Sequence, residues 1–115
     1  MSAAIDLYAT LVQQIDAVAA STCARHSDPA AGPTIAQIEY TIDTDWSGDD
    51  AIHFLVIVHD PPAGASLDFN ALRAIAREME GAVSAQGIPR IPYVAVRLAS
   101  EQAALSAAQG VTSPP

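Results

Sequence analysis

The sequence predicts an α+β two-layer sandwich, in which two helices lie on one face of a three-stranded sheet. Two observations predict it. Apolar residues recur at spacings of three and four in two long stretches, as they do on one face of a helix. Three other stretches alternate between apolar and polar residues or are continuously apolar, as strands are. In chain order these stretches give α-β-β-α-β, followed by a short C-terminal helix.

The first helix is predicted over residues 3–24. Ser2 is a suitable N-cap, and Asp6 lies in the first turn, where the helix dipole favours a carboxylate. The apolar stripe of this helix consists of Ile5, Tyr8, Leu11, Val12, Ile15, Val18 and Ala19. The segment from His26 to Pro33 contains two prolines and one glycine, which predicts a loop that turns the chain back onto the helix.

Two strands joined by an acidic loop come next. The first, about Thr34–Asp43, alternates between Ala36, Ile38, Tyr40 and Ile42 on one face and Gln37, Glu39, Thr41 and Asp43 on the other, which predicts a half-buried strand. The second, about Ala51–His59, carries apolar side chains on both faces. Such a strand is typical of the centre of a sheet, so we expect the second strand to be central or covered on both sides.

The second helix is predicted over about Leu67–Gln86. Its start can be capped by Ser66 or Asp68, whose side chains accept hydrogen bonds from free backbone N–H groups. Gly87, followed by Pro89, is expected to end it, because glycine suits the residue after a helix and proline cannot continue one.

The last strand is predicted over about Pro92–Ala99, and Ser100 can cap a short third helix. The resulting order of elements is similar to that of the small KH type II domains, which bind single-stranded RNA through a G-x-x-G loop with basic neighbours. No G-x-x-G occurs in this chain, and its net charge has the opposite sign. The resemblance therefore concerns topology alone, and topology does not imply function.

Size and charge narrow the classes of function. The chain has 115 residues, half of them apolar, which is enough for one domain with its own core. We assign residues 1–110 to this domain and expect residues 111–115 to be frayed. The net charge is −8, and all five basic residues are arginine. Because nucleic-acid affinity depends on cations that displace counterions, this charge disfavours direct binding to DNA or RNA.

The N-terminus lacks the positive charge of a signal peptide, and Asp6 and Asp16 interrupt its apolar residues. The longest uninterrupted apolar run, Phe54–Val58, is far too short to cross a bilayer. We therefore expect a cytoplasmic, bacterial protein with no membrane partner. Cys23 is the one cysteine and lies on the apolar side of the first helix, which predicts a buried structural thiol.

The loop from Asp43 to Asp50 resembles the first half of a calcium loop, with Asp and Ser oxygens followed by a glycine at the turn. The second half does not match, because Phe54 stands where a bidentate Glu is needed and the flanking segments are strands. Asp43, Asp45 and Asp49 remain candidates for calcium binding, but we predict no metal site and no cofactor.

The alternative interpretation of this loop is an ordinary hairpin connection. Gly48 then supplies the turn, and the Asp and Ser side chains accept hydrogen bonds from loop amides. Trp46 would fold onto an edge of the core or remain exposed for a partner.

No motif of a nucleophile, a phosphate-binding loop or a dinucleotide-binding fold occurs in the sequence. His53 and His59 point to the same face of their strand, but the strand's rise separates them by roughly 20 Å, too far to chelate one ion. Asp49, Asp50 and His53 could serve an enzyme, yet no complete set of base, nucleophile and oxyanion donor can be assembled. We therefore predict no catalytic residues and no enzymatic activity.

The face of the sheet away from the two long helices is the predicted interaction surface. Leu55, Ile57 and Tyr93 lie in its middle, and polar or charged residues surround them. An apolar centre with a polar rim is typical of a protein interface. A partner or a second copy could cover this face, or the C-terminal helix could fold over it. The residues predicted to bind a partner are Trp46, Asp49, Asp50, Leu55, Ile57, Tyr93 and Arg97.

Two motifs carry a resemblance to a protein family. The stretch D-W-S-G-D-D-A-I-H-F and the later I-P-Y-V-A-V-R-L-A-S-E-Q-A-A-L resemble a family of small bacterial proteins of unassigned function. The family pattern is roughly D-W-[ST]-G-[DE]-x-A-[IV]-x-F, then P-Y, an Arg and S-E-Q-A-x-L. The matching residues are Asp45, Trp46, Ser47, Gly48, Asp49, Ala51, Ile52, Phe54, Pro92, Tyr93, Arg97, Ser100, Glu101, Gln102 and Leu105. The resemblance implies a HEPN-like helical partner, as in a toxin–antitoxin pair, and no catalytic residues.

Three hypotheses of function follow from the sequence. The first is a non-enzymatic, antitoxin-like subunit that binds and restrains a partner protein. The second is an acidic mimic of nucleic acid that occupies a basic groove of another protein. The third is a small enzyme that depends on calcium or another metal bound at the acidic loop.

Overall fold

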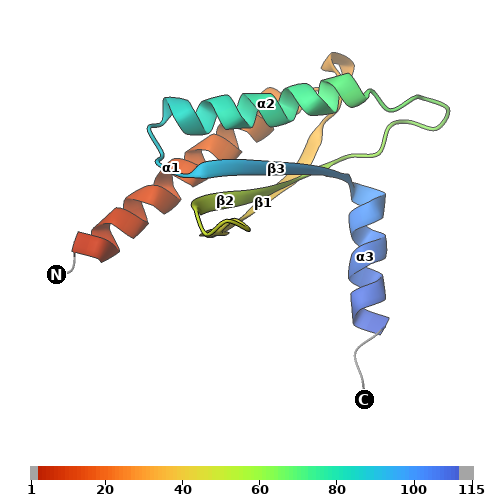
Figure 1. Ribbon diagram of the computed structural model, residues 1–115. Coiled ribbons are helices and arrows are strands. Elements are labelled where there is room, and N and C mark those ends of the chain that lie inside the picture. Colours follow the sequence, from red (N-terminus) through yellow and green to blue (C-terminus); the bar gives the residue numbers. More distant parts are fainter. Residues whose placement is uncertain (1–2, 112–115) are drawn as a thin grey trace.

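The computed structural model describes residues 3–111, and side chains from Leu7 to Ala108. It confirms the predicted α+β class, with the order α-β-β-α-β-α and a three-stranded sheet (Figure 1). The elements are α1 (Ala3–Arg25), the short 3₁₀ helix η1 (Pro29–Ala31), β1 (Ile35–Thr44), β2 (Asp50–Val58), α2 (Phe69–Ala85), β3 (Ile91–Leu98) and α3 (Ala99–Val111). The predicted Ser2 cap and residues 112–115 of the predicted tail lie outside the described residues.

The sheet has the strand order β1-β2-β3, so β2 is the central strand, as its two apolar faces predicted. β1 pairs antiparallel with β2, and β3 pairs parallel with β2. The β1–β2 register shifts once, between Ile35 and Gln37. The β2–β3 register runs without a shift from Ala51 opposite Ile91 to Val58 opposite Leu98. This register places Tyr93 beside His53 on one face of the sheet.

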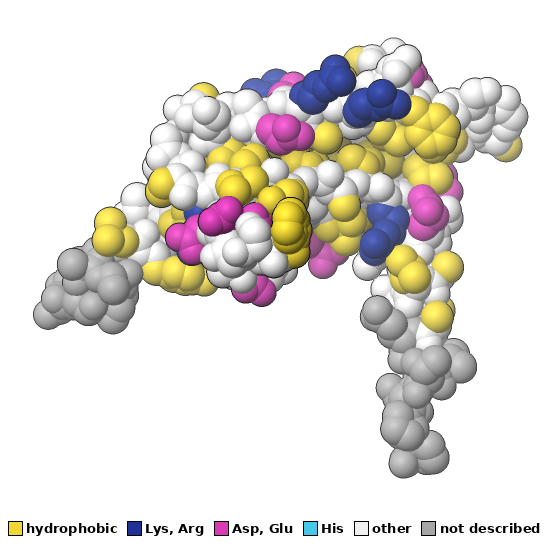
Figure 2. Space-filling view, in the orientation of Figure 1, with side chains coloured by type: hydrophobic (Ala, Val, Ile, Leu, Met, Phe, Trp, Pro, Cys, Tyr) yellow, Lys and Arg dark blue, Asp and Glu magenta, His cyan; other side chains and the backbone are white. Residues whose placement is uncertain are grey.

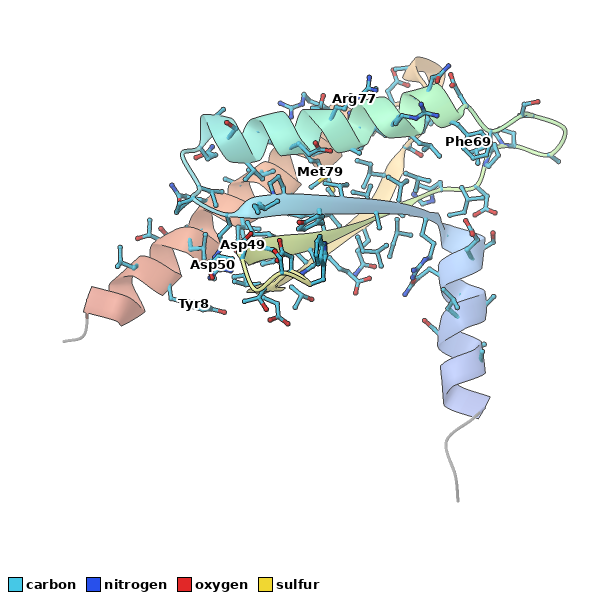
Figure 3. All side chains as sticks on the ribbon, in the orientation of Figure 1. Tyr8, Asp49, Asp50, Phe69, Arg77 and Met79 are labelled. Carbon is cyan, nitrogen blue, oxygen red and sulfur yellow. The ribbon has the colours of Figure 1, made fainter. Side chains whose placement is uncertain are left out.

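The core lies between the sheet and the two long helices, which both cover the same face (Figure 1). Its buried members from the helices are Ile15, Val18, Ile75, Met79 and Val83. Its buried members from the central strand are Ile52, Phe54, Val56 and Val58, which alternate along β2. Figure 3 shows Met79 on the side of α2 that faces the sheet, whereas Arg77 points away from it. The helix spacing of three and four therefore predicted the packed face of α2 correctly.

Both ends of α2 follow from local chemistry. The Asp68 carboxylate accepts hydrogen bonds from the N–H groups of Asn70 and Ala71, so Asp68 is the N-cap and the helix begins at Phe69. Gly87 follows the C-cap residue Gln86 and has a positive φ of 70°, a conformation that suits a residue without a side chain. The predicted start at Leu67 is two residues early, because the Asp68 cap sets the first turn.

One prediction about α1 is wrong at its N-terminal end. Tyr8 was placed in the apolar stripe, but its side chain is exposed, because this part of the helix extends beyond the sheet that it would cover (Figure 1). Ile15 and Val18, further along the same stripe, are buried. Cys23 is half-buried, and burial raises the pKa of its thiol.

The C-terminal helix α3 projects from the end of β3 on the side of the sheet opposite α1 and α2 (Figure 1). The Asp60 carboxylate accepts a hydrogen bond from the Ser100 N–H at 2.9 Å, and Glu101 accepts one from the Leu98 N–H at 3.0 Å. The predicted cap at Ser100 is therefore wrong, since Ser100 is already inside the helix and the capping carboxylate comes from Asp60, which follows the neighbouring strand β2. Nearby α3 residues such as Leu105 remain exposed, so this helix does not fold flat over the sheet.

The outline of the molecule is more extended than that of a typical globular chain. The Cα radius of gyration is 16.1 Å, whereas a compact chain of this length has a value of about 13 Å. Figure 1 shows why, because α3 and the beginning of α1 both extend past the sheet. Among the described helices, none combines the length and the apolar character that a membrane span requires.

Candidate partner-binding surface

The hairpin loop between β1 and β2 is organised by one carboxylate. Oδ1 of Asp45 accepts hydrogen bonds from the Ser47 N–H at 2.9 Å, the Ser47 hydroxyl at 2.7 Å and the Asp49 N–H at 2.9 Å. The backbone closes the same turn, because the Asp45 N–H donates to the Asp49 carbonyl and the Gly48 N–H donates to the Asp45 carbonyl. Gly48 has a φ of 89°, which a side chain would disfavour. These contacts fix the conformation of the loop.

The loop is also attached to the sheet at two points. The Tyr93 hydroxyl on β3 donates a hydrogen bond to Oδ2 of Asp45 at 2.9 Å. Nε2 of His53 on β2 lies 3.0 Å from the carbonyl oxygen of Thr44. The rings of His53 and Tyr93 stack with centroids 5.5 Å apart and planes 14° from parallel. The stacked rings therefore connect the neighbouring strands β2 and β3. Each of the two residues also contacts the loop or the residue just before it, His53 at Thr44 and Tyr93 at Asp45.

These contacts change the acidity of both partners. Hydrogen bonds from the Ser47 hydroxyl, the Asp49 N–H and the Tyr93 hydroxyl stabilise the ionised carboxylate and lower the pKa of Asp45 to about 2. The hydrogen bond to Asp45 raises the pKa of Tyr93, and the nearby negative charges add to the effect. At neutral pH the pair is thus a charged acceptor and a neutral donor, the combination that gives the stronger hydrogen bonds.

Trp46 lies within this ordered loop and is 94% exposed. Of the two sequence interpretations, the structure favours the exposed tryptophan over one that folds onto an edge of the core. The neighbouring acids, Asp49 and Asp50, lie in the same part of the molecule and are also exposed (Figure 3). The site therefore presents an aromatic ring within a negatively charged surface.

The three acidic metal candidates make other contacts. Asp43 accepts a hydrogen bond from the Thr44 N–H at 2.7 Å, and the Asp49 carboxylate lies 3.1 Å from the Ser47 hydroxyl, which donates its hydrogen bond to Asp45. The Asp45 carboxylate accepts the hydrogen bonds from Ser47, Asp49 and Tyr93 that are described above. Within residues 3–111, no group of three or more His, Cys, Asp or Glu side chains is arranged to hold a metal ion. The hydrogen bonds from the loop amides of Ser47 and Asp49 to Asp45 are the contacts that the hairpin interpretation predicts.

The open face of the sheet extends from this loop to the start of α3. Leu55 is half-buried near its centre, and Tyr93 beside it is 38% exposed. Ile57 is only 5% exposed, because it lies at the end of the sheet where α3 begins. Ile57 is covered at this end, so the accessible apolar centre is smaller than the sequence predicted. Arg97 lies at the same end and donates a hydrogen bond to Gln102 at 2.7 Å.

Two contributors to this surface are not among the predicted binding residues. Arg90 donates hydrogen bonds to the carbonyl oxygens of Asp43 at 3.2 Å and Ala51 at 2.9 Å, so it joins both sides of the hairpin. Its guanidinium also lies 4.0 Å from the Asp50 carboxylate. Ala95 is exposed on β3 directly opposite Leu55 and extends the apolar centre. Sequence patterns are local, and these contacts join positions about forty residues apart.

The surface uses two of its polar groups in contacts within the protein. Its imidazole, His53, is used in ring stacking and in a contact with a backbone carbonyl. Its most acidic carboxylate, Asp45, is held in the ionised form by loop hydrogen bonds. Both groups therefore serve the conformation of the surface.

Comparison of the chain with protein-family models, with curated proteins and with solved structures gives no match. The family resemblance of the two sequence motifs therefore stays a prediction. What the structure defines is a class of architecture, an α+β sandwich with one sheet face covered by helices and the other open beside an acidic loop closed by hydrogen bonds.

Proposed function

We propose that this protein is a non-enzymatic interaction subunit that binds and restrains a partner protein through its acidic hairpin loop and open sheet face. The observation that carries the proposal is Trp46, which is 94% exposed on a loop fixed by the hydrogen bonds of Asp45. Tryptophan is enriched among the residues that dominate binding energy, because its large ring excludes much water on contact.

Preorganisation of the loop supports the proposal. A flexible loop loses conformational entropy when it binds, and this loss weakens the complex. Here the turn is already closed by backbone and side-chain hydrogen bonds, and Tyr93 attaches it to the sheet. The tryptophan can therefore enter a pocket on a partner without a further cost of ordering the loop.

The charge pattern indicates the kind of partner. Asp49 and Asp50 beside the tryptophan are exposed and carry negative charge, and the neighbouring sheet face has Leu55 and Ala95 at its centre. A complementary partner has an apolar pocket surrounded by Lys or Arg. The HEPN-like helical protein implied by the motif resemblance is our proposed partner.

The test is a tagged pull-down from the native host, with nuclease present, at low and at high salt. The variant Trp46→Ser combined with Leu55→Ser removes the aromatic ring and the centre of the face. We expect it to weaken partner binding by at least about 30-fold, the effect of losing a hot-spot residue worth about 2 kcal/mol. The matched control is Tyr8→Ser, which removes another exposed aromatic ring, on α1.

Each outcome is informative. A partner that persists at high salt, is lost with the double variant and is retained by the Tyr8 variant supports the proposal. Binding that is unaffected by the double variant refutes it. A partner that is lost at high salt but retained by the double variant indicates the acidic mimic instead, because such binding depends on charge. A thermal melt that rises with millimolar calcium would favour the metal-dependent hypothesis.

A further inference from the structure

The outer edge of β3 is free, because the strand order β1-β2-β3 places β3 at one side of the sheet. β3 has 8 residues, which gives an edge of about 26 Å at the usual rise per residue. Natural proteins protect such edges with lysines, bulges or covering segments, since an unprotected strand can pair with another strand. β3 has no bulge in its register with β2 and no lysine, and Pro92 stands only at its beginning.

An apolar groove runs between this edge and α2. It has a volume of about 450 Å³ and lies between Leu72 and Ala76 of α2 and Val94 and Val96 of β3. Figure 2 shows hydrophobic side chains along this side of the molecule, between the arginines of α2 and the sheet. Phe69 lines the groove and is 66% exposed. A strand added to β3 would bury apolar side chains here as well as backbone groups.

The charges beside this edge are self-complementary. The acidic hairpin loop lies at the beginning of β3, where Tyr93 binds Asp45. Arg97 lies near the other end of the strand, and β3 itself contains no acidic residue. If a second copy approaches in the antiparallel direction, its Arg97 lies near the acidic loop of the first copy, and the symmetric contact forms at the other end. The opposite charges favour this orientation.

We propose that a second copy of this chain pairs antiparallel with the edge of β3, so that two three-stranded sheets form one continuous six-stranded sheet with two-fold symmetry. A two-fold interface uses the same surface on both copies, as this arrangement requires. In this dimer α2 of one copy lies beside α2 of the other, and the second copy covers the groove between α2 and β3. The dimer differs from one formed through the open sheet face and leaves that face accessible in both copies.

The edge of β1 is less suited to the same pairing. Its register is shifted between Ile35 and Gln37, which bends the strand. Antiparallel pairing of two β1 strands about Thr41 would place Glu39 of each copy opposite Asp43 of the other, and like charges that face each other across a sheet are destabilising. In this register the charge pattern disfavours β1 as the paired edge.

The expected affinity is modest. A strip about 26 Å long and about 15–20 Å wide, which spans the strand and one adjoining helix layer, covers roughly 400–500 Å² on each copy. The total of roughly 800–1,000 Å² falls below the range for stable specific interfaces and within that of weak, transient ones. We therefore expect a reversible monomer–dimer equilibrium in the micromolar range.

The test is sedimentation velocity of the full chain from low to high micromolar concentration. We expect the wild type to change from monomer to dimer, and Ala95→Lys to remain monomeric throughout, because a lysine on an exposed edge opposes pairing. The matched control is Thr41→Lys, which adds the same charge at an exposed position of β1 and should leave the dimer unchanged. Circular dichroism of both variants establishes that they are folded.

A second measurement locates the interface. In a Cys23→Ala background, Ala95→Cys or Thr41→Cys provides one exposed thiol for a short bis-maleimide cross-linker. We expect efficient cross-linking of two copies at position 95 and little at position 41. A wild type that stays monomeric at all concentrations overturns the proposal. A dimer that survives Ala95→Lys, or that cross-links at position 41 in preference to position 95, also overturns it. None of these outcomes tests the proposed partner, because both experiments measure self-association of the isolated chain.

Discussion

Replacement of Met79 by alanine tests whether α2 is held to the sheet as the structure shows. The Met79 side chain is fully buried among the core residues between α2 and the sheet. Alanine lacks about three heavy atoms of this side chain, and their transfer from water to the core contributes about 2.4 kcal/mol. A residual cavity of up to about 70 Å³ adds up to about 1.7 kcal/mol, less if the neighbours relax into it. We expect a loss of about 2.5–4 kcal/mol in the free energy of unfolding.

The assay is urea unfolding followed by far-UV circular dichroism, with the slope of the transition compared between variants. A loss of this size corresponds to a fall in Tm of about 10–15 °C for a domain of this length. Arg77→Ala is the matched control, because Arg77 is exposed on the opposite side of the same helix (Figure 3). It should change the free energy of unfolding by no more than about 0.5 kcal/mol. A loss below about 1 kcal/mol for Met79→Ala would show that α2 is not packed as described.

Two predictions concern pH. Burial and the hydrogen bond to Asp16, 2.6 Å long, raise the pKa of Tyr40 to about 12, so its contribution to stability is complete below pH 10 and lost as pH rises toward 12. The difference in unfolding free energy between the wild type and Tyr40→Phe should therefore shrink over that window, and a difference that stays constant to pH 12 would contradict the assignment. The lowered pKa of Asp45 means that its contribution is present above pH 3.8 and lost as pH falls through about 2. Fluorescence anisotropy of Trp46, the single tryptophan, should hold its value to below pH 3 and fall near pH 2, whereas a transition near pH 4 would show that the loop contacts do not form in solution.

The preorganised loop connects the stability of the fold to the proposed function. The Asp45 carboxylate that organises the loop is attached to the sheet by its hydrogen bond with Tyr93. The position of Tyr93 is set in turn by the parallel pairing of β3 with β2. A change that displaces β3 therefore disturbs Trp46, although the two positions lie far apart in the sequence. We expect partner binding and the integrity of the sheet to be lost together under mild denaturation.

Local sequence patterns were sufficient for the class of fold and for most of the core. Alternation of apolar and polar residues identified β1, and the two apolar faces of β2 identified the central strand. Spacing of three and four identified Ile75, Met79 and Val83 as the buried side of α2. These inferences succeed because strand and helix periodicity are properties of neighbouring residues, and burial of one face follows from them directly.

The tertiary structure decided what those patterns could not. The bond between Tyr93 and Asp45 joins residues 48 positions apart, and the cap of α3 joins Asp60 to Ser100 across 40 positions. The exposure of Trp46 and the burial of Ile57 depend on these contacts and on the direction in which α3 leaves the sheet. Periodicity shows which face of an element is apolar, but it does not show which distant segment meets that face. The sequence by itself therefore determined the layers of this protein, and only the packing of distant segments decided which residues form its exposed surface.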